Sequence, residues 1–140
     1  MRVLALDIGS KKTGIALSSL NQEIIFPLNK LVLKEFKGNL FFEMLKKQLN
    51  RVWEEIDTVV IGKVNQDNAI ADLIDQVTRL LKAWTNWEVI LISETNSTVD
   101  SRALLNRAGY RGKKKANKVD SYAALLFLFD FFKTEVLVNF

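Results

Sequence analysis

The sequence predicts an α/β protein in which a mixed sheet is flanked by helices. In the first quarter of the chain, two short connections join three apolar stretches, which is typical of an antiparallel meander. Strand and helix patterns then alternate, which is typical of parallel strands joined by helices. The 140 residues are 49% hydrophobic and include one proline, so we expect a single domain with one core over residues 1–140.

The three N-terminal strands are predicted between residues 3 and 33. Val3–Leu6 is continuously apolar, which is typical of a strand covered on both faces. Residues 13–18 and 23–33 are expected to follow as the second and third strands, with a turn between them at residues 20–22. Pro27 cannot donate a sheet hydrogen bond, so we expect the third strand to be an edge strand or to carry a bulge there.

Helical spacing of apolar residues begins after these strands. Residues 36–55 are predicted to form one amphipathic helix and residues 70–81 a second. Buried-strand patterns at 57–62 and 87–92 complete a five-stranded sheet of three antiparallel and two further parallel strands. The three tryptophans, Trp53, Trp84 and Trp87, are interpreted as core or helix-edge residues rather than ligand contacts.

Two further helices are predicted in the C-terminal third. Ser97–Asp100 resembles a capping box and predicts a helix that reaches about Arg107. Asn117 is expected to cap a last helix whose apolar face includes Val119, Tyr122, Ala123, Leu126, Phe129 and Phe132.

The composition excludes several kinds of chemistry. The chain has no cysteine and no histidine, which excludes disulfides, thiolate metal sites and a Ser-His nucleophile pair. A catalytic site would therefore use carboxylates, lysines, hydroxyls or a hard metal ion. Asp7 interrupts the apolar N-terminus before a secretory signal could form, and the longest apolar run, Tyr122–Phe129, is too short to span a bilayer, so we expect a cytoplasmic protein.

The turn after the first strand has the composition of a ligand site. Asp7 stands at the strand's exit, and Gly9 and Gly14 permit close approach to the backbone. Donors and positive charge come from Ser10, Lys11 and Lys12. A carboxylate beside cations indicates metal and phosphate binding; the alternative is that Asp7 forms an Asx-turn that shapes a hairpin.

Two more acids are expected near Asp7. Glu94 follows the fifth strand, and the carboxyl ends of parallel strands share one edge of a sheet, where ligands collect. Asp120 lies in the first turn of the last predicted helix and would join them if that helix crosses the sheet there. The structural alternatives are that Asp120 completes the cap begun by Asn117 and that Glu94 stabilises a helix N-terminus.

Positive charge is concentrated in residues 102–118. This segment contains seven basic residues and no acid. The rest of the chain then has 13 basic and 16 acidic residues, so all of the excess positive charge lies in this segment. A concentrated basic patch is typical of a nucleic-acid binder, although a lysine run can also serve only as a solvated surface. The basic residues of the segment are Arg102, Arg107, Arg111, Lys113, Lys114, Lys115 and Lys118.

The motifs together resemble those of the YqgF/RuvX family. The resemblance covers essentially the whole chain and rests on residues 7–16, residues 59–62, Glu94 with residues 97–100, and residues 109–121. It implies a ribonuclease H-like fold and a nuclease that matures the 5′ end of pre-16S ribosomal RNA; the family was earlier proposed to resolve Holliday junctions. In two places the sequence departs from the family pattern: Lys63–Asn65 replaces a segment that usually carries a proline, and Thr95 replaces an arginine.

The resemblance assigns catalysis and metal binding to Asp7, Glu94 and Asp120. Clustered oxygen ligands favour Mg²⁺ or Mn²⁺, and in ribonuclease H-like enzymes two such ions, about 3.5–4 Å apart, activate the water and stabilise the leaving oxygen. Tyr110 is expected either to stack on an unpaired base or to pack against the protein. Nucleic-acid contacts are assigned to Lys11, Lys12, Tyr110, Arg111, Lys113, Lys114, Lys115 and Lys118.

Three functions are consistent with the sequence. The first is a metal-dependent hydrolase acting on precursor ribosomal RNA, with the small-subunit precursor as a possible partner. The second is a structure-selective DNA nuclease that cuts four-way junctions, and the third is an inactive RNA- or ribosome-binding factor. An actin-like ATPase, whose phosphate loop also opens with an aspartate, is rejected because 140 residues hold only one of the two domains it needs.

Overall fold

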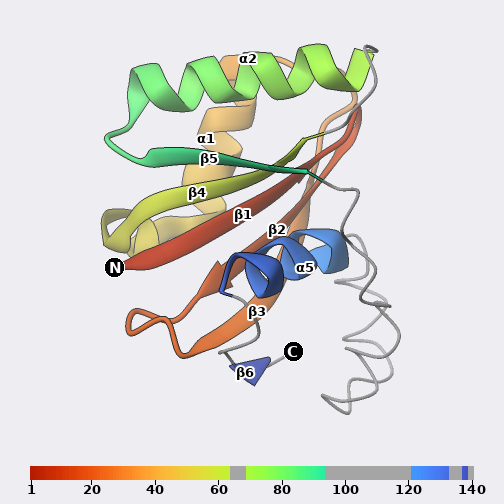
Figure 1. The fold of residues 1–140 in the computed structure, drawn as a ribbon. Coiled ribbons are helices and arrows are strands. Elements are labelled where there is room, and N and C mark those ends of the chain that lie inside the picture. The colour runs from red at the N-terminus through yellow and green to blue at the C-terminus, as the bar shows by residue number, and fades with distance from the viewer. Residues whose placement is uncertain (64–68, 94–120, 133–136, 139–140) are drawn as a thin grey trace.

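The computed structural model describes residues 1–63, 69–93, 121–132 and 137–138 and contains one central sheet (Figure 1). The strand order is β5-β4-β1-β2-β3-β6. β1 pairs antiparallel with β2, β2 pairs antiparallel with β3, and the β1–β4, β4–β5 and β3–β6 pairs are parallel. The strands are β1 (Arg2–Ile8), β2 (Lys12–Ser18), β3 (Ile24–Val32), β4 (Ile56–Lys63), β5 (Glu88–Ser93) and β6 (Leu137–Val138).

The five predicted strands and their mixed pairing are confirmed. β6 was not predicted; it is two residues long and pairs only with Ile24 and Ile25. Pro27 was expected on an edge strand or at a bulge, but in the described sheet β3 lies between β2 and β6. The β2–β3 register shift lies beyond Pro27, between the Leu28 and Leu31 pairs, and β6 as described pairs with Ile24 and Ile25, so Pro27 lies past the end of that pairing.

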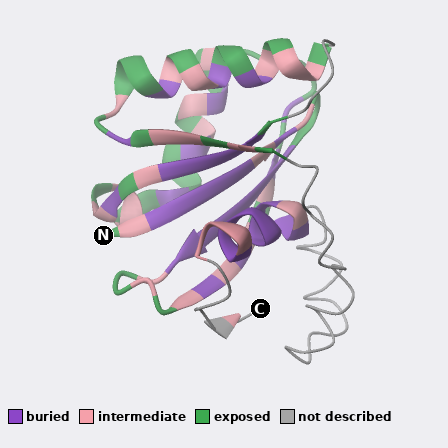
Figure 2. Ribbon diagram, in the orientation of Figure 1, coloured by how far each residue is buried: buried purple, intermediate pink, exposed green. Residues whose placement is uncertain are grey.

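Helices cover both faces of the sheet. α1 (Gly38–Leu49) and α2 (Ala69–Trp84) pack on the face that includes Leu4 and Leu6, whereas α5 (Tyr122–Phe131) packs on the face of Val3 and Ala5 (Figure 1). Successive β1 side chains point to opposite faces, so one apolar strand contributes to both cores. Figure 2 shows the central strands buried between these layers, while the outer side of α2 is exposed.

Two helix predictions are corrected or incomplete. The predicted helix over residues 36–55 is two elements, because Asn50 has a φ of 45° and the chain continues as a 3₁₀ helix, η1 (Asn50–Glu55). α5 has more than one apolar face, since every residue from Ala124 to Phe129 is buried. The predicted capping residue Asn117, Val119 and the predicted helix at 97–107 lie outside the described residues.

No helix in the described part of the chain is long and apolar enough to cross a membrane.

Candidate active site

The carboxyl ends of β1, β4 and β5 meet at one edge of the sheet. Leu6 of β1 is in register with Ile61 of β4, and Ile61 is in register with Leu91 of β5. Adjacent strands are spaced about 4.8 Å apart, so the ends of β1 and β5 are separated by roughly 10 Å across β4. Ligand sites of α/β sheets lie at such an edge.

Asp7 lies at this edge, on the face that α5 covers. It is half-buried and alternates with Val3 and Ala5, which contact the α5 core. Its partner on β2 is Gly14, which has no side chain to crowd the carboxylate. Asp7 also has an interaction partner within the protein. The strand therefore holds the Asp7 carboxylate at a defined position beside a residue that leaves it accessible.

The β1–β2 turn brings positive charge next to Asp7. A Cβ on Gly9 would lie 2.6 Å from the backbone oxygen of Lys12, so this tight turn requires glycine. The backbone oxygen of Lys11 accepts a hydrogen bond from the Leu33 N–H at 2.8 Å, which attaches the turn to the end of β3. Ser10, Lys11 and Lys12 are exposed on the surface of this turn.

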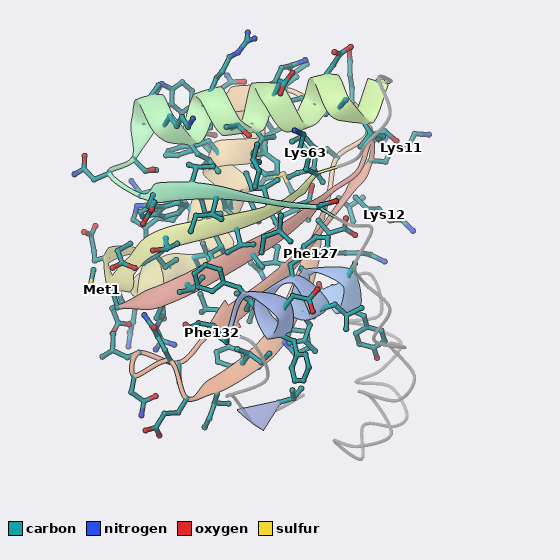
Figure 3. The ribbon with its side chains drawn as sticks, viewed as in Figure 1. Met1, Lys11, Lys12, Lys63, Phe127 and Phe132 are labelled. Carbon is teal, nitrogen blue, oxygen red and sulfur yellow. The ribbon has the colours of Figure 1, made fainter. Side chains whose placement is uncertain are left out.

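Lys63 adds a third exposed lysine to this edge. It is the last residue of β4 and pairs in register with Ser93 of β5. It lies two positions beyond Ile61, which pairs with Leu6 of β1. Figure 3 shows Lys11, Lys12 and Lys63 at the same end of the sheet, far from Met1. Sequence reasoning treated Lys63 only as a departure from the family pattern, although its position after a buried strand is the same signal that identified Asp7.

Ser121 fixes the start of α5 against the sheet. Its side chain is fully buried, and its Oγ accepts a hydrogen bond from the Ile15 N–H at 3.0 Å and donates one to the Leu28 carbonyl at 2.6 Å. Ile15 and Leu28 are paired in register beside the β2–β3 irregularity. Because Ile15 follows Gly14, the partner of Asp7, the hydroxyl attaches the beginning of α5 next to the candidate site.

Gly62 allows α5 to lie close to β4. A Cβ on Gly62 would collide with the ring of Phe127, a residue of the α5 core. Sequence reasoning did not assign roles to Gly62 or Ser121, because each acts through a residue far away in the chain.

The structure describes part of the predicted site. Asp7, Gly9, Ser10, Lys11, Lys12 and Gly14 lie in and beside the β1–β2 turn, and their predicted roles stay predictions. Glu94 and Asp120 are adjacent in sequence to the described residues Ser93 and Ser121, but they lie outside the described chain. Also outside it are Tyr110, Arg111, Lys113, Lys114, Lys115 and Lys118.

Within the described segments, no group of three histidine, cysteine, aspartate or glutamate side chains could hold a metal ion. Asp7 is the one predicted ligand in those segments, and its oxygen atoms are of the type that Mg²⁺ and Mn²⁺ prefer. The donor chemistry fits these ions, but a complete site would require Glu94 and Asp120 as well.

The chain matches known proteins over almost its entire length. The model of the RuvX family, described as Holliday junction resolvase, matches residues 1–134. A Mycoplasma mobile protein named "Putative pre-16S rRNA nuclease" is 30% identical over 135 residues, covering 94% of this chain and 91% of its own length. A Campylobacter lari protein with the same name is 31% identical over 133 residues, covering 94% of this chain and 98% of its own.

Solved structures confirm the predicted ribonuclease H-like fold. The fowlpox virus Holliday junction resolvase superposes with a TM-score of 0.64 at 15% identity, covering 96% of this chain and 99% of its own. The Thermus thermophilus RuvC in complex with a Holliday junction substrate superposes with a TM-score of 0.54 at 14% identity, covering 96% and 97%. At these identities the likeness shows the fold alone.

Proposed function

The chain belongs to the RuvX family of nucleic-acid hydrolases, and from this premise we propose that it is a metal-dependent nuclease that matures the 5′ end of pre-16S ribosomal RNA. The observation that supports the proposal is the position of Asp7 at the carboxyl edge, beside Gly14 and exposed lysines. The described neighbours of the other two acids lie on either side of β1: Ser93 ends β5, which is separated from β1 by β4, and Ser121 is hydrogen-bonded to β2 and β3.

In this proposal Asp7, Glu94 and Asp120 hold Mg²⁺ or Mn²⁺. When bound, these ions would lower the pKa of a water molecule and neutralise charge on the scissile phosphate. Lys11, Lys12 and Lys63 would bind backbone phosphates on either side of the cut. Further phosphate contacts come from the basic segment, with Arg111, Lys113, Lys114, Lys115 and Lys118, while Tyr110 stacks on an unpaired base.

The test compares wild type with Asp7→Asn on an RNA that spans the 5′ end of the small-subunit rRNA, with and without Mg²⁺ or Mn²⁺. We expect cleavage to require metal and to fall by at least about 100-fold in Asp7→Asn, because the substitution removes a charged ligand while RNA binding is retained. Asp75→Asn is the matched control, since Asp75 is an exposed acid on α2, which covers the face of the sheet opposite to that of Asp7. Undiminished cleavage by Asp7→Asn would refute the catalytic assignment.

A second function is favoured by the family description and by the resolvase fold. Here the same acids would cut a four-way DNA junction, and a symmetric pair of cuts would require a dimer. Running the junction beside the RNA decides between the two, because the preferred substrate is cleaved faster at equal enzyme concentration. Binding without cleavage of either substrate would instead identify an RNA- or ribosome-binding factor, to which Lys63 and Thr95 point as departures from the family pattern.

A further inference from the structure

A pocket lies at the opposite edge of the sheet from Asp7. It has a volume of about 350 Å³ and is formed where η1, the start of β4 and the α2–β5 connection meet. Figure 3 places Met1, one of its lining residues, at the far end of the molecule from Lys11 and Lys12. The other lining residues on which the inference depends are Trp53, Glu54, Asp57, Trp84, Thr85 and Trp87.

All three tryptophans of the chain line this pocket. The rings of Trp53 and Trp87 have centroids 4.5 Å apart, and Phe42 makes edge contacts with Trp53 and with Trp84 at 5.3 and 4.9 Å. Trp87 is buried, but Trp84 is 52% exposed, which is a large aromatic surface to leave in water. Trp87 fits the expected core position and Trp84, as the last residue of α2, fits the expected helix edge, but neither position accounts for the pocket that the three rings share.

The pocket wall is held in place by hydrogen bonds. The Thr85 hydroxyl donates to the Leu81 carbonyl at 2.6 Å and accepts from the Trp87 N–H at 3.2 Å, while the Thr85 N–H bonds to the same carbonyl. These bonds fix the connection between Trp84 and Trp87. A ligand would enter a preformed site and would not have to order this loop.

The charge of the pocket favours a cation. Glu54 and Asp57 are exposed carboxylates, and no lysine or arginine side chain lines the pocket. The α-ammonium of Met1 is the one positive group among the lining residues, so the carboxylates outnumber it two to one. The ion pair of this region in the described chain joins Arg2 to Glu55, so it does not neutralise Glu54 or Asp57. The 16-residue helix α2 also ends here, and the negative end of its dipole attracts positive charge; Lys82 in its last turn supplies part of that charge but does not line the pocket.

The chain already places one cation on this aromatic cluster. Lys46 Nζ lies 5.8 Å from the centroid of the Trp53 ring, within the range of a cation–π contact. The exposed Trp84 has no such cation among the described residues. The same interaction is therefore available on Trp84 to a cation from outside the chain.

We propose that this tryptophan pocket binds an arginine side chain from a basic segment of a protein partner. A guanidinium is planar, stacks on an indole and donates hydrogen bonds to carboxylates such as Glu54 and Asp57, whereas an ammonium does only part of this. A nucleic-acid strand is disfavoured, because the two carboxylates repel phosphates. The sheet thus has a basic edge for nucleic acid and an acidic aromatic edge for a basic protein.

The indole N–H signals of the three tryptophans report on the pocket directly in a ¹⁵N-correlated NMR spectrum. Titration of the full chain with a hexa-arginine peptide should shift the Trp84 and Trp53 signals, with a Kd that weakens as salt rises. A hexa-lysine peptide should bind more weakly. Failure of hexa-arginine to shift these signals at millimolar concentration would refute the proposal.

Charge variants then test the assignment without disturbing the core. Glu54→Gln with Asp57→Asn should weaken hexa-arginine binding roughly fivefold, the effect of losing about 1 kcal/mol from exposed charge pairs. Glu43→Gln with Asp72→Asn removes the same charges from exposed positions on α1 and α2 outside the pocket and should leave the Kd unchanged. An equal loss in both double variants would overturn the proposal, since it would indicate only non-specific attraction.

Two other occupants give different results. Shifts of the same signals by a short single-stranded RNA, or by raising the concentration of the protein alone, would overturn the proposal in favour of a base-stacking site or a self-association surface. None of these measurements uses cleavage, so the outcome is independent of the nuclease assignment.

Discussion

Gly62 lies where β4 packs against α5. Because glycine has no side chain, the two elements can approach each other closely at this point. The Phe127 ring occupies the space that a Cβ would need. Neither residue has a polar group, so their role is one of packing. Their contact nevertheless bears on the site, because Gly62 directly follows Ile61, which pairs with the residue before Asp7.

Gly62→Ala should therefore destabilise the protein by roughly 1–3 kcal/mol, the usual cost of forcing extra atoms into a packed core. Urea unfolding measures this difference. Gly38→Ala is the control: its new Cβ would meet only the end of the flexible Leu80 side chain, at 2.9 Å, and alanine favours the helix. Phe127→Leu should reduce the cost of Gly62→Ala, and a cost that is the same in both backgrounds would refute the proposed contact.

Asp130 is an acid near the end of α5 whose burial raises its pKa above the ordinary value of 3.8. Folding thus favours the protonated carboxyl. The free energy of unfolding is therefore lowered as pH rises above the pKa that Asp130 has in the unfolded chain, because the buried carboxyl must then either ionise or stay protonated at a cost. Asp130→Asn should raise Tm at pH 7 and have no such effect at pH 3, where both states are protonated. Asp75→Asn, on the exposed side of α2, serves as the comparison. An equal gain at both pH values would contradict the titration argument.

At the scale of elements, Ser121 connects a helix to two strands. Its hydroxyl satisfies a donor on β2 and an acceptor on β3 in a fully buried position. Ser18 is its counterpart elsewhere in the sheet: it is also fully buried, and its Oγ accepts from the Val3 N–H and donates to the Ser19 carbonyl. The two serines differ in that only Ser121 adjoins the candidate site.

Ser121→Ala and Ser18→Ala should each cost about 1–3 kcal/mol, because each leaves buried backbone groups without a partner. Under conditions where both variants stay folded, only Ser121→Ala should reduce kcat on the preferred substrate, since it loosens α5 beside Asp7. Thermal unfolding and cleavage are measured on the same samples. If the two variants lose activity equally, stability alone accounts for the loss and Ser121 has no positioning role.

The sequence predicted those elements whose periodicity is strong and local. The five main strands and α2 were found because each has a run of apolar residues at a regular spacing. The end of α1 was missed because Asn50 adopts a positive φ, which a hydrophobic pattern does not indicate. β6 was missed because two residues do not form a pattern, and the burial of α5 on several sides depends on packing rather than on helical period.

The candidate site was predictable to the extent that its parts are close in sequence. Asp7, Gly9 and Lys11 lie in one turn, so their composition alone indicated a ligand. Ser121 bonds to Ile15 across 106 positions, and no local pattern reveals such a contact. The tryptophan pocket was missed for the same reason, since Trp53 in η1 lies about 30 positions before Trp84, at the end of α2, and Trp87, in the α2–β5 connection.

Two ends of the described sheet carry different exposed charges: Lys11, Lys12 and Lys63 lie at the carboxyl edge, and Glu54 and Asp57 line the tryptophan pocket. The basic segment 102–118 contains seven basic residues and no acid, and we expect it to contact nucleic-acid phosphates. Replacing Lys113, Lys114 and Lys115 together by alanine should then weaken binding to RNA of any sequence. Because each phosphate contact releases counterions, the slope of log K against log salt for single-stranded RNA should become less steep by about two.

The matched control removes the same three charges from exposed positions on α1, η1 and α2, with alanine at Lys47, Arg51 and Arg79. These residues lie on helices rather than at the carboxyl edge, so the control should keep the wild-type slope. Filter binding at four or five salt concentrations measures both variants against wild type. A slope that is reduced equally in the two triple variants would mean that net charge, and not the basic segment, governs binding. A slope unchanged in both would show that the 113–115 lysines are only a solvated surface, and phosphate binding would then depend on Lys11, Lys12 and Lys63.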